Sequence, residues 1–272
     1  MRKVVLVAFV CIAIGGIGLF ITSSAFFIKV ANGAVETKKL EQKQFKNEQI
    51  KNIHVDTDVG DVVIEKGETD LFEVRYSSDQ EKRKLDVNEN GEMLQVEVKM
   101  KKKHIFDFSF FSFDLKDDTL TIIVPERVYN KIEAETAAGT IRVENIQSGN
   151  ISAHSAAGDV KMKEIKAQNV KVSSSAGDIV LHKVEGKVRA DSAAGSVEIV
   201  QHNPEYSVEA DSAAGDVNIK LKEMPKDAVV KGSANVGEVQ IFGKENKEIT
   251  LGNGKVQIKG KTSAGSIKIE VD

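Results

Sequence analysis

The stretch "SAAGDV" occurs at Ser155–Val160 and again at Ser212–Val217. In each copy, small residues and a glycine come before a polar residue and an aliphatic one. Such a phrase, recurring at a period too short for a globular domain, indicates a repeat architecture. Close copies read TAAGTI from Thr136, SSAGDI from Ser174, SAAGSV from Ser192 and TSAGSI from Thr262.

The glycine of the phrase sets the period of the repeat. From Gly139 to Gly237, successive glycines are 19, 19, 18, 20 and 22 residues apart. After each glycine, apolar and polar residues alternate, as in Val160-Lys161-Met162-Lys163, and a second alternating run precedes the phrase. Alternation with a period of two is typical of a strand with one buried face. We therefore expect an all-β fold, a single-stranded β-solenoid whose coils of about 19 residues stack on one another.

The Ser-Ala-Ala-Gly phrase is expected at the corner that joins the two strands of a coil. Glycine reaches backbone angles that a Cβ atom excludes, and serine and alanine are small enough to stack from coil to coil. The Asp that often follows is a common turn residue, which bonds its own backbone. The glycines assigned to structural turns are Gly139, Gly158, Gly177, Gly195 and Gly215.

The first 30 residues differ in composition from the repeats. Val4 to Ile28 contains no charged residue, and as a helix it would span about 37 Å, enough to cross a hydrocarbon core of roughly 30 Å. Arg2 and Lys3 favour a cytoplasmic N-terminus, with the C-terminal domain outside the cell membrane. We expect a single-pass transmembrane helix at residues 1–30. The alternative is a cleaved signal peptide.

Two further segments follow the expected anchor. Residues 31–50 are polar and of mixed charge, which predicts a stalk. The repeat domain then fills residues 51–272, where the insertion GKENKEITLGNGK predicts an extra hairpin or a broad loop near the C-terminal end. No cysteine follows Cys11, so this domain can hold no intrachain disulfide. The formal net charge of −3 argues against nucleic-acid binding.

A Lys/Phe-rich segment at residues 99–118 interrupts the repeats between two expected strands. We expect a hairpin with an aromatic face and a basic root. Either the hairpin caps the first coil, because an open solenoid end is an edge-strand liability, or it contacts a membrane or a partner protein. The candidate interaction residues are Lys101, Lys102, Lys103, Phe106, Phe108, Phe110, Phe111 and Phe113.

The repeats predict neither a catalytic site nor a metal site, and no cofactor. A catalytic residue is rarely copied once per coil, and one Asp per coil is too sparse for a calcium-binding β-roll. The histidines show no metal-binding spacing. The residues weighed here are Asp61, Asp159, Asp178 and Asp216, which share one turn position, and His54, His104, His154, His182 and His202.

Cations that alternate with apolar residues are expected to face outward. They could form a basic stripe for an anionic wall polymer, or they could be solubility charges interspersed with acidic residues. These cations are Arg142, Lys161, Lys163, Lys171, Lys183 and Arg189.

The N-terminal span, the stalk and the S-A-A-G-D-V coils together resemble the bacterial "putative adhesin" β-strand-repeat family, over roughly residues 50–272. Members carry a domain of unknown function with no established catalytic residues. The anchor and the Lys/Phe-rich insert make the chain similar to LiaG-like members, which are encoded beside an envelope-stress sensing system in Gram-positive bacteria.

That resemblance implies a membrane-anchored, non-enzymatic protein of the cell envelope. Its partner would be an envelope protein or a wall polymer, and its role would lie in adhesion or in the envelope stress response. A surface adhesin for a host or matrix ligand is one alternative. A carbohydrate-active β-helix enzyme is another, although the repeats do not bring carboxylates together in one groove.

Overall fold

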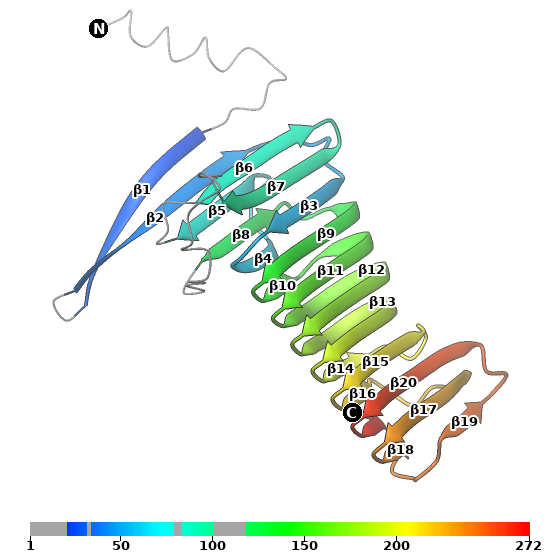
Figure 1. Ribbon diagram of the computed structural model, residues 1–272. Helices are drawn as coiled ribbons and strands as arrows, with labels where there is room; N and C mark the ends of the chain where they lie inside the picture. Colours follow the sequence, from blue (N-terminus) through cyan, green and yellow to red (C-terminus); the bar gives the residue numbers. More distant parts are fainter. Residues whose placement is uncertain (1–20, 32–33, 79–82, 101–117) are drawn as a thin grey trace, which may run out of the picture.

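The computed structural model describes residues 21–31, 34–78, 83–100 and 118–272. All regular structure in this part of the chain is β, and its 21 strands join in one continuous hydrogen-bonded sheet. The sheet winds into a rod of stacked coils (Figure 1). This confirms the expected all-β, solenoid-like fold.

The middle of the chain forms the body of the rod. Its strands are β9 (Val128–Ala138), β10 (Ile141–Glu144), β11 (Gln147–Ala157), β12 (Val160–Ala176), β13 (Ile179–Ala194), β14 (Val197–His202), β15 (Val208–Ala214) and β16 (Val217–Leu221). Each coil has a leading strand, which ends in the repeated phrase, and a following strand, which begins after the glycine. In β12 and β13 the following strand of one coil continues into the leading strand of the next.

Neighbouring coils pair in parallel and in register. In the leading strands, Ile151 lies between Ile132 and Val170. In the following strands, Val160 pairs with a residue of each neighbouring coil in the same way. Equivalent residues of the repeat therefore form columns along the rod. The leading strands make one outer face, called the leading face, and the following strands make the following face.

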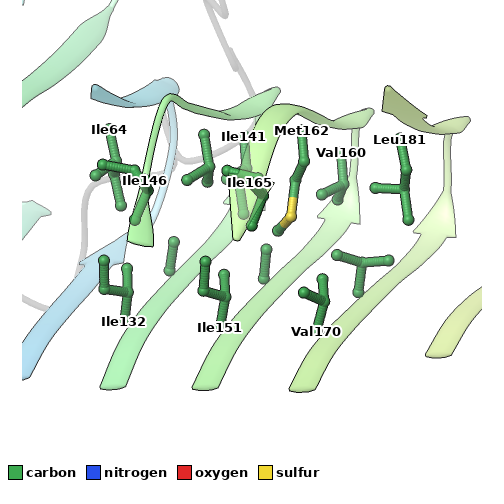
Figure 2. Close-up of a cluster of buried hydrophobic side chains, with 14 of the residues drawn as sticks. Ile64, Ile132, Ile141, Ile146, Ile151, Val160, Met162, Ile165, Val170 and Leu181 are labelled. Atoms are coloured by element: carbon green, nitrogen blue, oxygen red, sulfur yellow. The ribbon is translucent and has the colours of Figure 1, made fainter. Parts of the chain in front are cut away.

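The hydrophobic core lies between the two faces. Figure 2 shows Ile151 in the core on the side of the leading strands and Val160 in the opposite row, with Ile165 at the bend between following and leading strands. All three side chains are buried. Burying an aliphatic side chain of this size contributes about 1.5–3 kcal/mol, so each coil gains most of its stability by covering its neighbours.

At the C-terminal end the coils do not follow the order of the chain. The strands are β17 (Ala228–Val236), β18 (Val239–Ile241), β19 (Glu248–Leu251), β20 (Val256–Ala264) and β21 (Ile267–Val271). β20 lies between β15 and β17, and β21 lies between β16 and β18. The coil of Gly265 is thus inserted between the coils of Gly215 and Gly237 (Figure 1). β19 pairs antiparallel with β17, which agrees with the hairpin expected there.

The N-terminal end has a similar arrangement. Its strands are β1 (Ile21–Ala31), β2 (Ala34–Phe45), β3 (Asn52–Thr57), β4 (Asp61–Lys66), β5 (Phe72–Ser78), β6 (Arg83–Asn90), β7 (Met93–Met100) and β8 (Thr119–Val124). The coil of β3 and β4 lies between that of β7 and β8 and that of β9 and β10. Antiparallel strands extend both faces here: β6 lies beside β7, and β5, β2 and β1 follow one another beside β8.

The N-terminal strands differ from the expected anchor and stalk. Residues 21–28, expected in a transmembrane helix, belong to β1, which pairs with β2 along its whole length; their β-branched and aromatic residues suit a strand. Phe45 and Ile50, expected in the stalk, are buried in the core. No helix in the described part is long and apolar enough to cross a membrane. Residues 1–20 lie outside it, so within the expected span of 1–30 an anchor stays a prediction for those residues alone.

Candidate binding surface

The glycine column sets how closely the coils approach at their corners. Gly158 has φ of +144°, and a Cβ atom built on it would overlap the carbonyl oxygen of Gly139 in the neighbouring coil. Glycine is therefore required both for its backbone angle and for the close approach. The same holds for all the predicted turn glycines, whose φ values lie between +144° and +155°: Gly139, Gly158, Gly177, Gly195 and Gly215.

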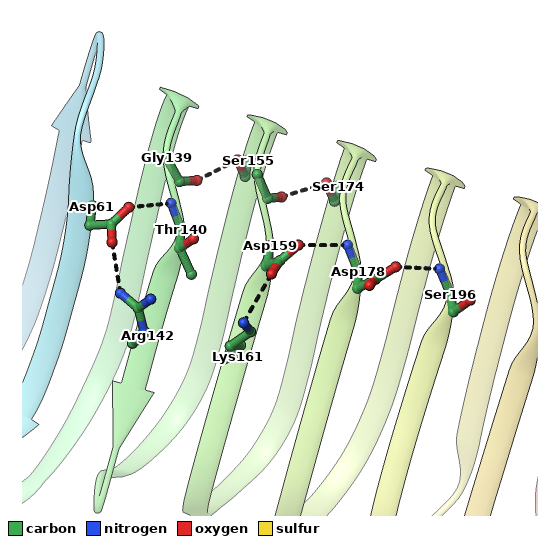
Figure 3. Close-up of polar contacts among 11 residues, drawn as sticks. Asp61, Gly139, Thr140, Arg142, Ser155, Asp159, Lys161, Ser174, Asp178 and Ser196 are labelled. Carbon is green, nitrogen blue, oxygen red and sulfur yellow. Dashed lines mark hydrogen bonds and ion pairs between the residues drawn. The ribbon is translucent and has the colours of Figure 1, made fainter. Parts of the chain in front are cut away.

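The serine that opens the phrase ties each corner to the next. The Ser155 hydroxyl donates to the carbonyl oxygen of Gly139 over 2.9 Å, and Ser174 donates to Gly158 over 2.9 Å (Figure 3). Both serines are buried. A buried hydroxyl bond of this kind contributes about 1 kcal/mol, and an unpaired buried carbonyl costs more. These serines are therefore structural, which agrees with their small size in the corner.

The Asp column is structural as well, through a different bond from the one expected. Asp159 accepts the backbone N–H of Asp178 over 3.0 Å, and Asp178 accepts that of Ser196 over 2.8 Å (Figure 3). Each carboxylate bonds the neighbouring coil, whereas we expected a bond to its own backbone. Burial alone would raise the pKa of Asp159, but hydrogen bonds from Lys161 and from the Asp178 N–H hold it below its ordinary value.

Beside these columns, the leading face is hollowed into a shallow trough of about 400 Å³, called the corner groove. The groove crosses five successive coils. One of its walls is a polar row in which His154, Ser173, Asp191, Asp211 and Lys261 are register neighbours. Its floor is formed by small residues at the exposed positions of the phrase: Ser175, Ala193, Ala213 and Ser263.

Charges within the polar row are largely balanced. The Arg189 guanidinium donates to Asp191 over 2.9 Å and to Glu209 over 2.5 Å, and lies 3.6 Å from Asp211. Burial, followed by repulsion from Glu209 and Asp191, raises the pKa of the Asp211 carboxyl. Lys261, on the next coil, makes no ion pair with a described residue. The groove therefore presents hydroxyls, carboxylates and one free ammonium group.

The row also places His154 beside Ser173, the one pair that resembles catalytic machinery. The His154 Nδ1 lies 2.9 Å from the Ser173 hydroxyl. An acid–histidine–serine relay needs a carboxylate on the second ring nitrogen, and no described carboxylate lies within ion-pair distance of His154. The arrangement offers hydrogen bonds to a ligand, and it does not form a nucleophilic triad.

The predicted basic stripe does not form a single surface. Arg142 and Lys161 lie on the following face, where each pairs with a carboxylate at 2.8 and 2.9 Å. Lys171 and Arg189 lie on the leading face, and Lys183 is at the bend between the faces, 3.6 Å from a glutamate. Residues of one alternating run share a face, but successive runs belong to different faces. Of the two alternatives for these cations, the stripe therefore does not form, and the ion pairs agree with the other, charges interspersed with acidic residues.

A second hollow, of about 370 Å³, lies at the opposite bend of the coils. Its rim carries both signs of charge, and Lys66 and Lys183 are paired there with carboxylates at 3.2 and 3.6 Å. Arg127 is held by the carbonyl oxygens of Asn47 and Glu48 and stacks over Phe72. Arg127 is occupied in holding the segment before β3, and both lysines are paired with carboxylates, so the corner groove is the better candidate.

The candidate interaction residues of the Lys/Phe-rich segment, at 101–117, lie outside the described residues, so both interpretations of that segment stay open. Its two flanks are described. β7 and β8 stack on β3 and β4 as the strands of an ordinary coil. At the root, Arg83 and Asp118 form a buried ion pair, and the Tyr76 hydroxyl donates to Asp118 over 3.1 Å.

Sequence reasoning missed the corner groove, although a signal for most of it exists. The polar row is the position just before the opening Ser or Thr of each phrase, so aligning the repeats would have collected His154, Ser173, Asp191 and Asp211. That alignment would have placed Ser233 next to Asp211. The structure places Lys261 there, because the coil of Gly265 is inserted ahead of the coil of Gly237.

Comparison with known proteins gives one family and several related structures. Residues 50–270 match the family model described as Toastrack DUF4097. A "putative cell adhesion protein" from Clostridium sporogenes is 15% identical, with a TM-score of 0.38, over 86% of this chain and 100% of that chain. A "putative adhesin" from Bacteroides fragilis is 16% identical, with a TM-score of 0.47, over 85% of this chain and 97% of that chain. No curated protein matches.

Proposed function

The chain belongs to the Toastrack DUF4097 family, and from this premise we propose that it is a non-enzymatic binding protein of the cell envelope. The observation that carries the proposal is the corner groove. The polar groups on the described surface are either bound into the coil corners or spread in rows along the rod. Rows of equivalent groups suit the binding of an extended ligand, whereas catalysis needs different groups converging on one reacting atom.

The geometry of the groove favours a polymer lying along the rod axis. Adjacent strands are about 4.8 Å apart, so five coils offer equivalent positions at that interval. The floor of Ala193 and Ala213 leaves room for a chain, and the wall supplies donors and acceptors from Ser173, Asp191 and Lys261. Because carboxylates and cations are balanced, we propose a hydroxyl-rich envelope glycan as the ligand, in preference to a strongly anionic wall polymer.

The location of the groove completes the proposal. With the segment before β1 as a membrane anchor and the C-terminal domain outside, the rod would hold the groove in the space next to the wall. A role in the envelope stress response is consistent with such a place. The alternative function is a surface adhesin whose groove takes a host or matrix ligand; it needs the same surface and differs only in the source of the polymer.

Co-sedimentation with purified Gram-positive cell walls tests this function. The full chain in detergent is compared with an Ala193→Arg/Ala213→Arg variant, which fills the floor at two exposed positions. The control, Val180→Arg/Asn218→Arg, adds the same charge on the following face. We expect the groove variant to lose at least tenfold in bound fraction, and the control to bind as wild type. Walls stripped of anionic polymer should bind equally well.

Three outcomes would contradict the proposal in different ways. Equal binding by the groove variant and the control would remove the site. Loss of binding on stripped walls would transfer the ligand to the anionic polymer. Absence of wild-type binding would overturn the glycan, and crosslinking in intact cells would then test a protein partner. Unchanged far-ultraviolet circular dichroism of both variants shows that the fold is retained.

A further inference from the structure

The coil of β20 and β21, called the C-terminal coil, is internal to the stack although the chain reaches it after the coil of β17 and β18. β20 and β21 together are hydrogen-bonded to four strands, with β15 and β16 on one side and β17 and β18 on the other. The connection from β16 to β17, residues 222–227, skips the position in the stack that β20 and β21 occupy. Without β20 and β21 that connection would border an empty slot about 9.6 Å wide, twice the strand spacing.

The slot binds its segment through the same contacts that hold every other coil. Ile258, Ile267 and Ile269 are buried. The Thr262 hydroxyl donates to Gly215 over 2.8 Å, and the backbone N–H of Ser266 donates to Asp216 over 2.8 Å. These contacts depend on the sequence of the segment and on its register. They do not depend on the covalent link between the segment and the coils around it.

The covalent link is a short turn between β19 and β20. Gly252 and Gly254 have φ of +60° and +73°, and a Cβ atom on Gly252 would lie 2.7 Å from the carbonyl oxygen of Lys226. The turn is fastened to the start of β17 by a bond from the Lys255 N–H to Asp227 over 3.1 Å. Tight hinges of this kind are where neighbouring copies exchange identical elements, because an opened hinge relieves the constraint.

We propose that the slot also accepts the β20–β21 segment of a second copy, so that two molecules join by exchanging their C-terminal coils. All contacts of the segment are reproduced in the exchanged pair. The exchanged pair and the single molecule therefore differ only in the conformation of the hinge. Because two molecules must associate to exchange, the exchanged fraction increases with protein concentration. The proposal is independent of the ligand of the corner groove.

Disulfide trapping between neighbouring rungs tests the exchange, because the chain has no cysteine besides Cys11. In a full-length Cys11→Ser background, Asp211→Cys and Lys261→Cys are made in separate chains. These two positions are register partners across the slot. The chains are unfolded, mixed, refolded in detergent at high concentration and oxidised. We expect a covalent heterodimer whose yield increases with concentration.

A matched control uses two partners in the same polar row that no exchange can separate. Asp191→Cys and Asp211→Cys, also in separate chains, are neighbours in the body of the rod. If the 211/261 pair gives no more heterodimer than this 191/211 pair, the exchange is overturned. One chain carrying both Asp211→Cys and Lys261→Cys should form an internal disulfide at low concentration, which shows that the chosen positions can be bridged.

Discussion

At the scale of single residues, the corner is defined by positions where only one side chain fits. The glycine column is the strictest, because both the φ angle and the neighbouring carbonyl exclude a Cβ atom. The serine and aspartate columns then satisfy the polar groups of the same corner. The glycine recurs in every copy of the phrase, whereas the Asp position also takes other polar residues such as Thr140 and Ser196.

We predict that Gly177→Ala destabilises the protein by at least about 3 kcal/mol, because strain and the overlap with Gly158 act together. Gly91→Ala is the matched control. Gly91 also has a positive φ, +58°, but no atom lies within 4 Å of the position of its Cβ, so only the backbone cost of about 1–2 kcal/mol applies. Urea unfolding of both variants measures the difference; equal losses would refute the role of coil contact.

His202 makes stability dependent on pH. Its side chain is fully buried, with ring nitrogens 3.2 Å and 3.0 Å from the carbonyl oxygens of Val184 and Tyr206. Burial lowers its pKa below the ordinary 6.5, and the two backbone hydrogen bonds only partly oppose this. Below pH 6.5 the unfolded chain therefore binds a proton more readily than the folded chain, so stability decreases as the pH falls.

We expect the free energy of unfolding to be level above pH 7 and to decline between pH 7 and pH 5. His202→Gln should flatten that decline, because it removes the buried group whose pKa is lowered on folding. Urea titrations at a series of pH values measure the slopes. An identical slope in wild type and His202→Gln would show that other groups cause the dependence.

At the scale of elements, the strands bend at left-handed residues that are not glycine. Asn145, Glu164 and Lys183 have φ of 57°, 55° and 54°, at equivalent positions of three coils. A left-handed residue with a Cβ atom costs roughly 1–2 kcal/mol, and burial of the aliphatic residue that follows offsets this cost. The side chains at these bends are exposed, so none of them is needed for packing.

Lys183→Gly should therefore stabilise the protein by about 0.5–1 kcal/mol. The substitution removes the cost of the left-handed backbone angle, and this gain is reduced by the greater conformational freedom that glycine gives the unfolded chain. Lys187→Gly, at an exposed strand position of the same element, should destabilise it by a similar amount. Thermal or urea unfolding distinguishes them by the sign of the change. A loss at position 183 would mean that its ion pair with Glu164 outweighs the backbone relief.

At the scale of the whole molecule, the repeats in the sequence predict the structural features that recur within every coil. The two strands per coil, the buried columns and the glycine corners follow from residues that every coil repeats, such as Val160 and Gly158. The corner groove follows only in part, since it requires knowing which coil lies beside which. Both out-of-order coils were missed, because each coil satisfies the register of any other equally well.

The signals that distinguish the end coils are departures from the phrase. The coil of Gly237 reads ANVGE, where Ala234 replaces the hydroxyl and Val236 the small alanine, and it lies at the tip of the rod. The coil of Gly265 retains the phrase, and it lies inside the stack. A coil that keeps its bonding residues needs neighbours on both sides, so these differences could have indicated the order.

The inserted C-terminal coil also bears on how the molecule is made. Strand partners such as Val217 and Ile267 are 50 positions apart, and β17 and β18 emerge from the ribosome before the coil that separates them from β15 and β16. The nascent rod must therefore keep two hydrophobic edges open until β20 and β21 have been synthesised. Synthesis that stops before β20 would leave an unfinished sheet with two exposed edges, so a truncated chain would be prone to edge-to-edge association.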